Sequence, residues 1–210
     1  QIEELTSLVE DRDQGISSYR ARIEELDAAI TEAQGRLQPL EDEVRQRLAF
    51  DEIRDRVAAI PGVRSAAVIS NLPIGGAAAG TFFHVEGTEA LPPGEEPWVI
   101  NKQTQPGYFE TMRIHLLAGR DFRSDDGAPG SPPVVIVNES FARRYWPDGQ
   151  ALGKRIKYGR PDSEYPWMEV VGVSGDVRHF GPERPVELGI TMPSVGVSRW
   201  RKKIVPRISS

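Results

Sequence analysis

Residues 134–147, VVIVNESFARRYWP, place a short strand directly before a short helix. Val134 to Val137 form a four-residue apolar run between Pro133 and Asn138, which is short enough for a central strand. Asn138 is a suitable N-cap, because its side-chain oxygen can accept a free backbone N–H of the first helical turn. The helix is expected over residues 139–145 and ends at Trp146-Pro147. This segment predicts a buried strand with a helix packed against the same core.

The sequence around this segment alternates helices and strands in similarly short pieces. Helices are expected over 49–60, where apolar residues share one face, and as a short turn over 107–113. Strands are expected over 63–70, around 82–85, over 97–105 and over 167–177, the last with a bulge at Gly172. Such alternation favours an α+β fold with a mixed sheet of short strands and packed helices, and it argues against a doubly wound fold.

Residues 1–48 follow a different pattern, a heptad repeat. Position a is apolar in all seven heptads, at Ile2, Val9, Ile16, Ile23, Ile30, Leu37 and Val44. Five of the seven d positions are also apolar, and the other two are Arg12 and Arg47. We predict an α-helical coiled coil that self-associates or forms an antiparallel hairpin, and branched residues at a with Leu at some d positions favour a parallel pair. The alternative is one amphipathic helix folded onto the chain's own domain.

The helix of residues 1–48 is expected to be interrupted. Gly15 and Gly35 weaken it, and Pro39 removes a backbone donor and clashes with the preceding turn. We therefore expect a kink or break near residues 35–39.

Composition narrows the classes of protein. The 210 residues include 26 basic and 31 acidic side chains, so the net charge of −5 argues against a nucleic-acid-binding protein. The absence of cysteine excludes disulfides, thiolate zinc sites and a cysteine nucleophile. No apolar run approaches the roughly 20 residues of a membrane-spanning helix, and no leader peptide is recognised. We expect the chain to be part of a larger protein.

Two loops suggest ligand binding only weakly. The glycine-rich stretch Gly75 to Gly80 lacks the Gly-Lys-Ser/Thr ending of a phosphate-binding loop, so we interpret it as a flexible connection. Asp125-Asp126-Gly127 resembles part of a calcium loop, but the later bidentate glutamate is missing. A solvated turn is the better interpretation of this second loop.

The histidines and serines do not form a recognisable active-site motif either. His84, His115 and His179 each lack a second histidine three to five residues away, and no Gly-x-Ser-x-Gly motif occurs. Asp176 precedes His179 by three residues, but the predicted strand end and turn would not place both on one helical face. We predict no catalytic, cofactor-binding or metal-ligating residue.

The C-terminal residues 194–210 are basic and include Arg199-Trp200-Arg201-Lys202-Lys203. Four cations around a tryptophan could contact anionic lipid headgroups or phosphate. Because the whole chain is acidic and Pro206 interrupts any amphipathic helix, we predict a disordered tail.

Several sequence blocks between residues 49 and 193 carry a family resemblance through their order and spacing. They are Pro61-Gly62-Val63, Ser70-Asn71-Leu72-Pro73, Pro106-Gly107-Tyr108-Phe109-Glu110-Thr111-Met112, Leu117-Ala118-Gly119-Arg120-Asp121-Phe122, Val135-Ile136-Val137-Asn138-Glu139, Ala142-Arg143-Arg144-Tyr145-Trp146-Pro147, Gly153-Lys154-Arg155 and Val170-Val171-Gly172-Val173-Ser174-Gly175-Asp176-Val177. Together they resemble the MacB-like periplasmic core domain of ABC transporter permeases, of the FtsX-type superfamily.

The resemblance implies a non-enzymatic domain on the extracytoplasmic face of the cell membrane. Such a domain transmits conformational change and contacts partner proteins or substrate during transport or efflux, while a cytoplasmic ATP-binding subunit or domain hydrolyses ATP. Permeases of this family commonly act as dimers, and here residues 1–48 could pair two copies. The implied partners include no nucleic acid.

The chain departs from the family pattern at both ends. Residues 1–48 occupy the place of a transmembrane helix and an opening strand, and the sequence after Val177 differs from the family's Tyr-x-Pro-Tyr-like continuation. These departures predict an incomplete core domain, which is a fragment, a fusion or a remnant.

Two other functions stay open at this stage. One is a soluble coiled-coil adaptor, in which residues 1–48 set the oligomeric state and the α+β part binds a partner. The other is a hydrolase or metal-dependent enzyme that uses Asp176 and His179.

Overall fold

The computed structural model describes residues 2–73, 79–92, 94–128, 130–181, 183–194 and 203–208. The chain divides into two compact units, residues 1–45 and residues 46–210. The helix α1, Ile2–Ala58, begins in the first unit and ends in the second. Helices and strands alternate in the second unit, as predicted, and the fold class is α+β with a mixed sheet.

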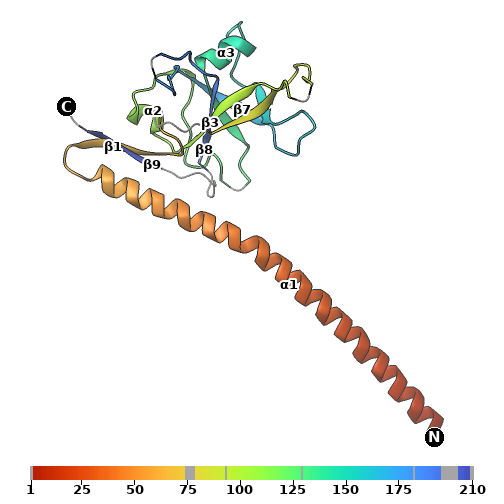
Figure 1. The fold of residues 1–210 in the computed structure, drawn as a ribbon. Coiled ribbons are helices and arrows are strands. Elements are labelled where there is room, and N and C mark those ends of the chain that lie inside the picture. The colour runs from red at the N-terminus through yellow and green to blue at the C-terminus, as the bar shows by residue number, and fades with distance from the viewer. Residues whose placement is uncertain are drawn as a thin grey trace. The chain divides into compact units, whose positions relative to one another are not determined.

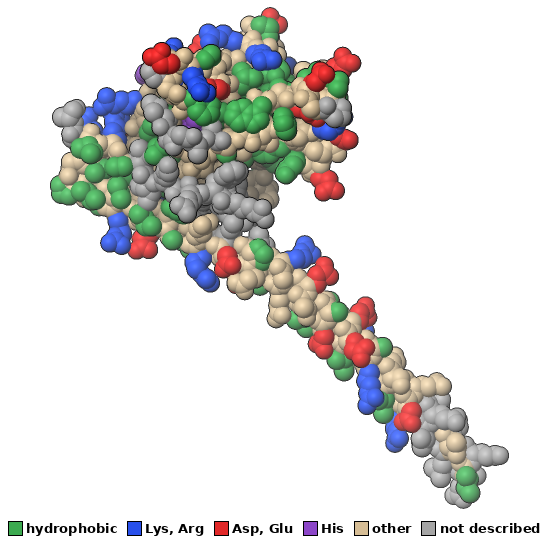
Figure 2. Space-filling view, viewed as in Figure 1, with side chains coloured by type: hydrophobic (Ala, Val, Ile, Leu, Met, Phe, Trp, Pro, Cys, Tyr) green, Lys and Arg blue, Asp and Glu red, His purple; other side chains and the backbone are tan. Residues whose placement is uncertain are grey.

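The helix α1 is one uninterrupted helix (Figure 1). It continues through Gly15, Gly35 and Pro39, so the predicted break near residues 35–39 is wrong. A proline inside a helix costs about 3 kcal/mol relative to alanine, which the well-formed turns on both sides can offset. The predicted helix over 49–60 is the C-terminal part of α1, which ends just before Pro61-Gly62. The surface of α1 carries apolar side chains among charged ones (Figure 2).

Six strands of the second unit close into a ring. They are β2 (Gly80–Val85), β6 (Arg155–Tyr158), β7 (Met168–Ser174), β5 (Val134–Asn138), β8 (Gly189–Pro193) and β3 (Trp98–Thr104). Each pairs with the next in this order, and β3 pairs back with β2. The β5–β7 and β8–β3 pairs are parallel and the other four are antiparallel.

Three further strands extend the sheet beyond the ring. The strand β1, Val63–Ile69, pairs antiparallel with β3 and with β9, Lys203–Ile208. The strand β4, Leu116–Gly119, pairs antiparallel with β7. The predicted disorder of the tail 194–210 is therefore wrong for residues 203–208, whereas residues 195–202 lie outside the described residues. Pro206 is compatible with this strand, because β9 pairs with β1 along one side and lies at the end of the strand order.

The central strand β5 is buried on both faces, as its apolar run predicts. Val135 and Val137 belong to one core cluster with residues of the other ring strands, whereas Val134 and Ile136 belong to a second cluster. The second cluster also contains Ala67 and Ile69 of β1, Tyr108 and Phe109 of the short helix α2 (Tyr108–Thr111), and Phe122. Full burial of a valine or isoleucine side chain contributes roughly 1.5–3 kcal/mol. The strand β5 thus joins the two cores.

The predicted bulge at Gly172 is confirmed. The register of β5 against β7 shifts between Val135, which faces Val170, and Ile136, which faces Gly172. The helix α3, Glu139–Tyr145, has the predicted bounds and begins at its cap, Asn138. The strands β4, β6, β8 and β9 lie outside the strands that the sequence predicts.

Candidate functional site

Asn138 lies where β5 ends and α3 begins, and its side-chain amide makes four hydrogen bonds. Its Oδ1 accepts from the backbone N–H of Phe141 at 3.2 Å and from that of Gly189 at 2.9 Å. Its Nδ2 donates to Asp176 Oδ1 at 2.8 Å and to the carbonyl oxygen of Glu187 at 3.0 Å. The predicted N-cap is confirmed by the Phe141 bond, and the other three bonds join α3 to the segment after β7 and to the start of β8.

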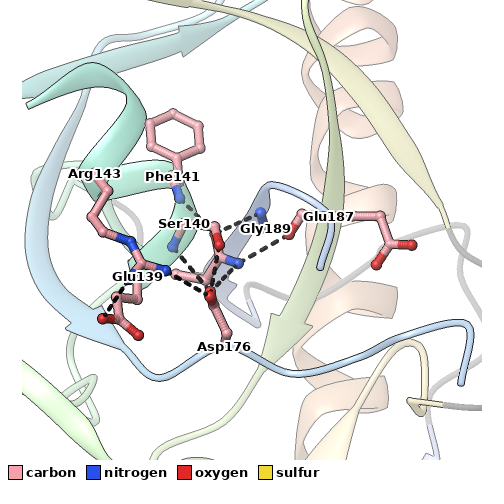
Figure 3. A network of polar contacts seen from close by, with 8 residues as sticks. Glu139, Ser140, Phe141, Arg143, Asp176, Glu187 and Gly189 are labelled. Atoms are coloured by element: carbon pink, nitrogen blue, oxygen red, sulfur yellow. Dashed lines mark hydrogen bonds and ion pairs between the residues drawn. The ribbon is translucent and has the colours of Figure 1, made fainter. Parts of the chain in front are cut away.

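Asp176 completes this junction from the segment that follows β7 (Figure 3). Its Oδ1 also accepts from the backbone N–H of Ser140 at 3.0 Å, and its Oδ2 accepts from the Ser140 hydroxyl at 2.6 Å. A carboxylate at the N-terminal end of a helix satisfies backbone donors that have no partner within the helix. We call Asn138, Ser140 and Asp176 the polar junction.

Arg143 extends the polar junction toward the surface. Its guanidinium lies 3.4 Å from Asp176 Oδ2 and 3.2 Å from Glu139 Oε1, one helical turn earlier. The arginine side chain is 65% exposed, so solvent screens both ion pairs and each contributes at most about 1 kcal/mol. The strength of the junction therefore comes from Asn138 and Asp176.

A small hollow of about 20 Å³ adjoins Asn138 on the side of Lys102, His179 and Glu187. Burial lowers the pKa of Lys102 to about 8, and the nearby carboxylate of Glu187 acts in the opposite direction. The hollow has room for about one water molecule. It is too small to receive a substrate beside the lysine.

The hydrolase hypothesis is not supported by the surroundings of its two residues. The Asp176 carboxylate accepts hydrogen bonds at the polar junction, and the His179 ring is fully buried with its centroid 5.3 Å from that of Phe180. The Ser140 hydroxyl donates to a carboxylate, whereas a serine nucleophile is activated by a base such as a histidine ring. The arrangement caps a helix and joins segments.

A larger hollow of about 330 Å³ opens on an apolar part of the surface. Its lining includes Tyr158, Tyr165, Pro166, Met168 and Met192, from β6, β7, β8 and the loop between β6 and β7. Methionine side chains adapt to differently shaped partners, and aromatic rings supply large contact area. We call these five residues the apolar hollow.

Comparison with known proteins identifies the family of this chain. The sequence model of the MacB-like periplasmic core domain matches residues 8–205. The chain belongs to this family. Its members are periplasmic domains of MacB/FtsX-like ABC transporter permeases. The match extends beyond the predicted limits of 49 and 193 at both ends, into the heptad segment and the C-terminal segment.

Three solved structures are similar to this MacB-like core domain. The periplasmic region of MacB from Actinobacillus actinomycetemcomitans superposes with a TM-score of 0.50 at 18% identity, over 74% of this chain and 63% of that one. A domain of a permease protein from Porphyromonas gingivalis gives 0.49 at 17%, over 74% and 61%. The extracellular domain of the noncanonic ABC-type transporter YknZ from Gram-positive bacteria gives 0.47 at 14%, over 76% and 72%. No curated protein matches the sequence.

The chain spans less than two thirds of the length of the first two of these structures. Within the described residues of the core domain, no helix has a stretch long and apolar enough to cross a membrane.

The remaining sequence candidates lie apart in the core domain. His84 lies in β2 with its ring centroid 6.0 Å from that of Trp167, and His115 is exposed just before β4. Residues 75–78 of the glycine-rich stretch lie outside the described residues, and Gly80 begins β2. Over the part of the chain that the structure describes, no group of three or more His, Asp or Glu side chains is placed to hold a metal ion.

Asp126 has a structural role that sequence reasoning missed. Its carboxylate accepts two hydrogen bonds from the Arg120 guanidinium, at 2.5 and 3.1 Å, and a third from the backbone N–H of Arg123 at 2.7 Å. Burial acts to raise the pKa of Asp126, but these donors outweigh it and the pKa is lowered. The loop is therefore fixed by an ion pair, and the predicted solvated turn is wrong for Asp126. The available signal was the Gly119-Arg120-Asp121-Phe122 block, which places an arginine six residues before Asp126.

Proposed function

We propose that this core domain is a non-catalytic, extracytoplasmic part of an ABC transporter permease. In this role it transmits conformational change and contacts partner proteins or substrate during transport or efflux. The observation that carries the proposal is the family match over residues 8–205. The energy comes from a cytoplasmic ATP-binding subunit or domain, to which the core domain is connected through membrane helices of the transporter.

The polar junction supports a mechanical role. Asn138 and Asp176 connect three segments that are far apart in sequence, and the closed ring of strands surrounds one of the two cores. Closely packed cores transmit displacement because they resist deformation. A force applied to one side of such a domain therefore displaces the whole domain.

The apolar hollow supports a contact role. Tyr165 is 60% exposed although it is a large aromatic residue, and it lies beside Met168 and Met192. Exposed apolar surface of this kind is typical of sites that bind proteins or apolar ligands. We infer that the partner or substrate contacts the domain here.

The test requires a transporter that carries this chain in its membrane. Replacing residues 63–208 by a short linker should abolish export and leave the ATP-binding subunit able to hydrolyse ATP. Tyr165→Ser should reduce export without loss of folding, and the matched control Leu117→Ser changes another apolar residue, 52% exposed, away from the hollow. Full export after the replacement would overturn the proposal, and full export by Tyr165→Ser would overturn the contact at the hollow.

A second function, the soluble coiled-coil adaptor, is favoured by one observation. The apolar a positions whose side chains the structure describes are exposed in the single chain, as a helix that sets an oligomeric state requires: Ile2, Ile16, Ile23, Ile30, Leu37 and Val44. In both functions, residues 1–48 would pair two copies. An unchanged oligomeric mass after deletion of residues 1–48 would exclude the adaptor.

A further inference from the structure

The apolar hollow lies at one mouth of the six-stranded ring. Its lining includes the ends of four neighbouring ring strands, which are Tyr158 of β6, Met168 of β7, Val134 of β5, and Met192 and Pro193 of β8. These ends meet because β5 runs parallel to β7, whereas β6 is antiparallel to β7 and β8 is antiparallel to β5. The mouth of a closed sheet is one of the places where proteins preferentially bind small molecules.

The core inside the ring forms the floor of the apolar hollow. Met168 is 5% exposed and belongs to that core cluster, and Tyr158 and Met192 are partly buried against the cluster. The ring of Tyr165 meets that of Tyr158 edge to face, with 5.8 Å between the centroids, and forms a wall. Because methionine side chains have several accessible rotamers, this floor can adapt to the shape of a bound molecule.

The lining of the hollow favours an uncharged occupant. Among the lining residues that the structure describes, no side chain is charged. Two hydroxyl groups of the lining already donate within the domain: Ser131 to the carbonyl oxygen of Asp125 at 2.8 Å, and Tyr158 to the sulfur of Met192 at 2.7 Å. A charged group placed here would lose its water and meet no opposite charge, which is costly. Binding must therefore come from the burial of apolar surface.

The size and rim of the hollow favour a small molecule over a protein. Its volume of about 330 Å³ lies within the range of ligand pockets, roughly 300–1,000 Å³. A stable protein interface instead buries roughly 800 Å² on each partner. Of the described lining residues, Tyr165 is the one large apolar side chain that is exposed, so the rim offers no extended apolar surface. The smaller hollow of about 190 Å³ differs in chemistry, because its lining contains the Glu96–Arg160 ion pair.

We propose that the mouth of the ring binds one uncharged, largely apolar small molecule, with Tyr158, Met168 and Met192 beneath it and Tyr165 beside it. The inference rests on the proposed contact role of the apolar hollow and names the chemical class of its ligand. The ligand is held by contact with rings and thioethers, and it needs no hydrogen bond from the Tyr165 hydroxyl.

Two dyes with the same rings test the ligand class on the full chain. N-phenyl-1-naphthylamine is uncharged and fluoresces more strongly in apolar surroundings, and its titration should saturate at one molecule per chain. The dye 8-anilino-1-naphthalenesulfonate adds one negative charge to these rings and should bind about tenfold more weakly or less. Equal affinity of the two dyes would overturn the uncharged class. Absence of saturable binding of the uncharged dye would overturn the proposal.

Variants of two exposed apolar residues test the position of the site. Tyr165→Ser should weaken binding of the uncharged dye about tenfold, because it removes an aromatic wall. Tyr165→Phe keeps the ring and should change the affinity by less than about twofold. The matched control is Leu91→Ser, at a residue of the smaller hollow that is 46% exposed, and it should leave the affinity unchanged. Weaker binding by Leu91→Ser with unchanged binding by Tyr165→Ser would place the dye in the smaller hollow and overturn the proposal.

Export measurements on the transporter separate this inference from the proposed function. If a partner protein occupies the hollow, Tyr165→Ser lowers export while the natural chain shows no saturable binding of the dye. That result would overturn the small-molecule ligand and leave the contact role in place. If the permease role is wrong, export is unaffected by the replacement of residues 63–208, whatever the dye shows. The two failures are therefore distinguishable.

Discussion

Asn138 uses the full hydrogen-bonding capacity of its side chain, with two bonds donated and two accepted. Asn138→Ala would leave the backbone N–H groups of Phe141 and Gly189 without this acceptor. Because each lost bond costs about 1 kcal/mol and a buried donor without a partner costs more, we expect a loss of about 2–4 kcal/mol in the free energy of unfolding.

Urea unfolding followed by tryptophan fluorescence measures this effect in the second unit, because residues 1–48 contain no tryptophan. The exposed residue Asp148 supplies the control variant Asp148→Ala, which should change the stability by less than about 0.5 kcal/mol. Equal stability of the Asn138→Ala and natural chains would show that the junction does not hold the domain together.

Lys102 gives the stability a pH dependence. Its pKa is lowered from 10.5 to about 8 in the folded chain, so between these pH values the unfolded chain holds a proton that the folded chain has released. The free energy of unfolding therefore rises with pH across this window, by up to about 3 kcal/mol from this group. Below pH 8 both states are protonated and the group adds no pH dependence.

The measurement is the difference in unfolding free energy between the natural chain and Lys102→Met, taken across the same pH range. The difference should change in favour of the natural chain as the pH rises. Lys154→Met, at an exposed lysine, should show no such change. Parallel pH profiles for the natural chain and Lys102→Met would contradict the lowered pKa.

At the residue scale, the sequence predicts the contact of the polar junction that is local in sequence, which is the helix cap. The cap at Asn138 is visible because a strand and a helix meet there within a few residues. Its bonds to Asp176 and Gly189 join residues 38 and 51 positions apart, and nothing in the local sequence indicates such partners. The pKa of Lys102 likewise depends on burial, which only the folded sheet determines.

At the element scale, Gly119 allows β4 to lie close to β7. A Cβ at this position would lie 2.2 Å from the carbonyl oxygen of Val171, and the backbone has a φ of +74°. Gly119→Ala should therefore destabilise the second unit by about 3 kcal/mol or more, through the steric clash and the unfavourable backbone. The backbone of β7 cannot move aside easily, because it is paired on its other edge.

Gly149→Ala is the matched control for this clash. Gly149 has a similar φ of +78°, but a Cβ there meets nothing within 4 Å. Gly149→Ala should lower the free energy of unfolding only through the unfavourable backbone conformation, by about 1–2 kcal/mol. Urea unfolding of both variants separates the contribution of the steric clash from that of the backbone conformation. Equal losses in the free energy of unfolding would show that β4 does not lie tightly against β7.

The helix α1 contains two residues that lower its stability and that no packing contact requires. Gly35 occupies an outward position and a Cβ there meets nothing within 4 Å, while Pro39 removes a helical hydrogen bond. Gly35→Ala should stabilise the helix by about 1 kcal/mol and Pro39→Ala by about 3 kcal/mol. Thermal melting followed by far-ultraviolet circular dichroism measures both.

The control is Ala28→Gly at the same heptad position as Gly35, which should lower the melting temperature. A lower melting temperature for Gly35→Ala would mean that the glycine meets a neighbour in solution.

The elements that the sequence predicted well are those with strong local signals. The apolar run of β5, the cap of α3 and the bulge at Gly172 all depend on a few adjacent residues. The strands β6 and β4 have only four residues each, which is too few for a period of two to be recognised. The strand β9 was hidden by its basic residues and Pro206, and it forms because β1 offers a free edge.

At the scale of the whole molecule, closure of the ring could not be predicted. It depends on β3 pairing with both β2 and β8, and β8 begins 85 residues after β3 ends, from 104 to 189. Long-range pairing of this kind leaves no local sequence signal. The family resemblance supplied what local patterns could not, and the family match bears it out.

The second unit should fold without the heptad segment, because every residue of both core clusters lies after residue 46. We expect residues 46–210 to be a folded monomer by light scattering and tryptophan fluorescence, and the full chain to have a dimeric mass. Residues 46–62 still contribute, since Gln105 donates to Asp51 at 2.7 Å and accepts from Arg54 at 3.2 Å. A chain of residues 63–210 should therefore be less stable than 46–210 by about 1–2 kcal/mol. Aggregation of 46–210 would instead mean that the heptad segment covers apolar surface of its own domain.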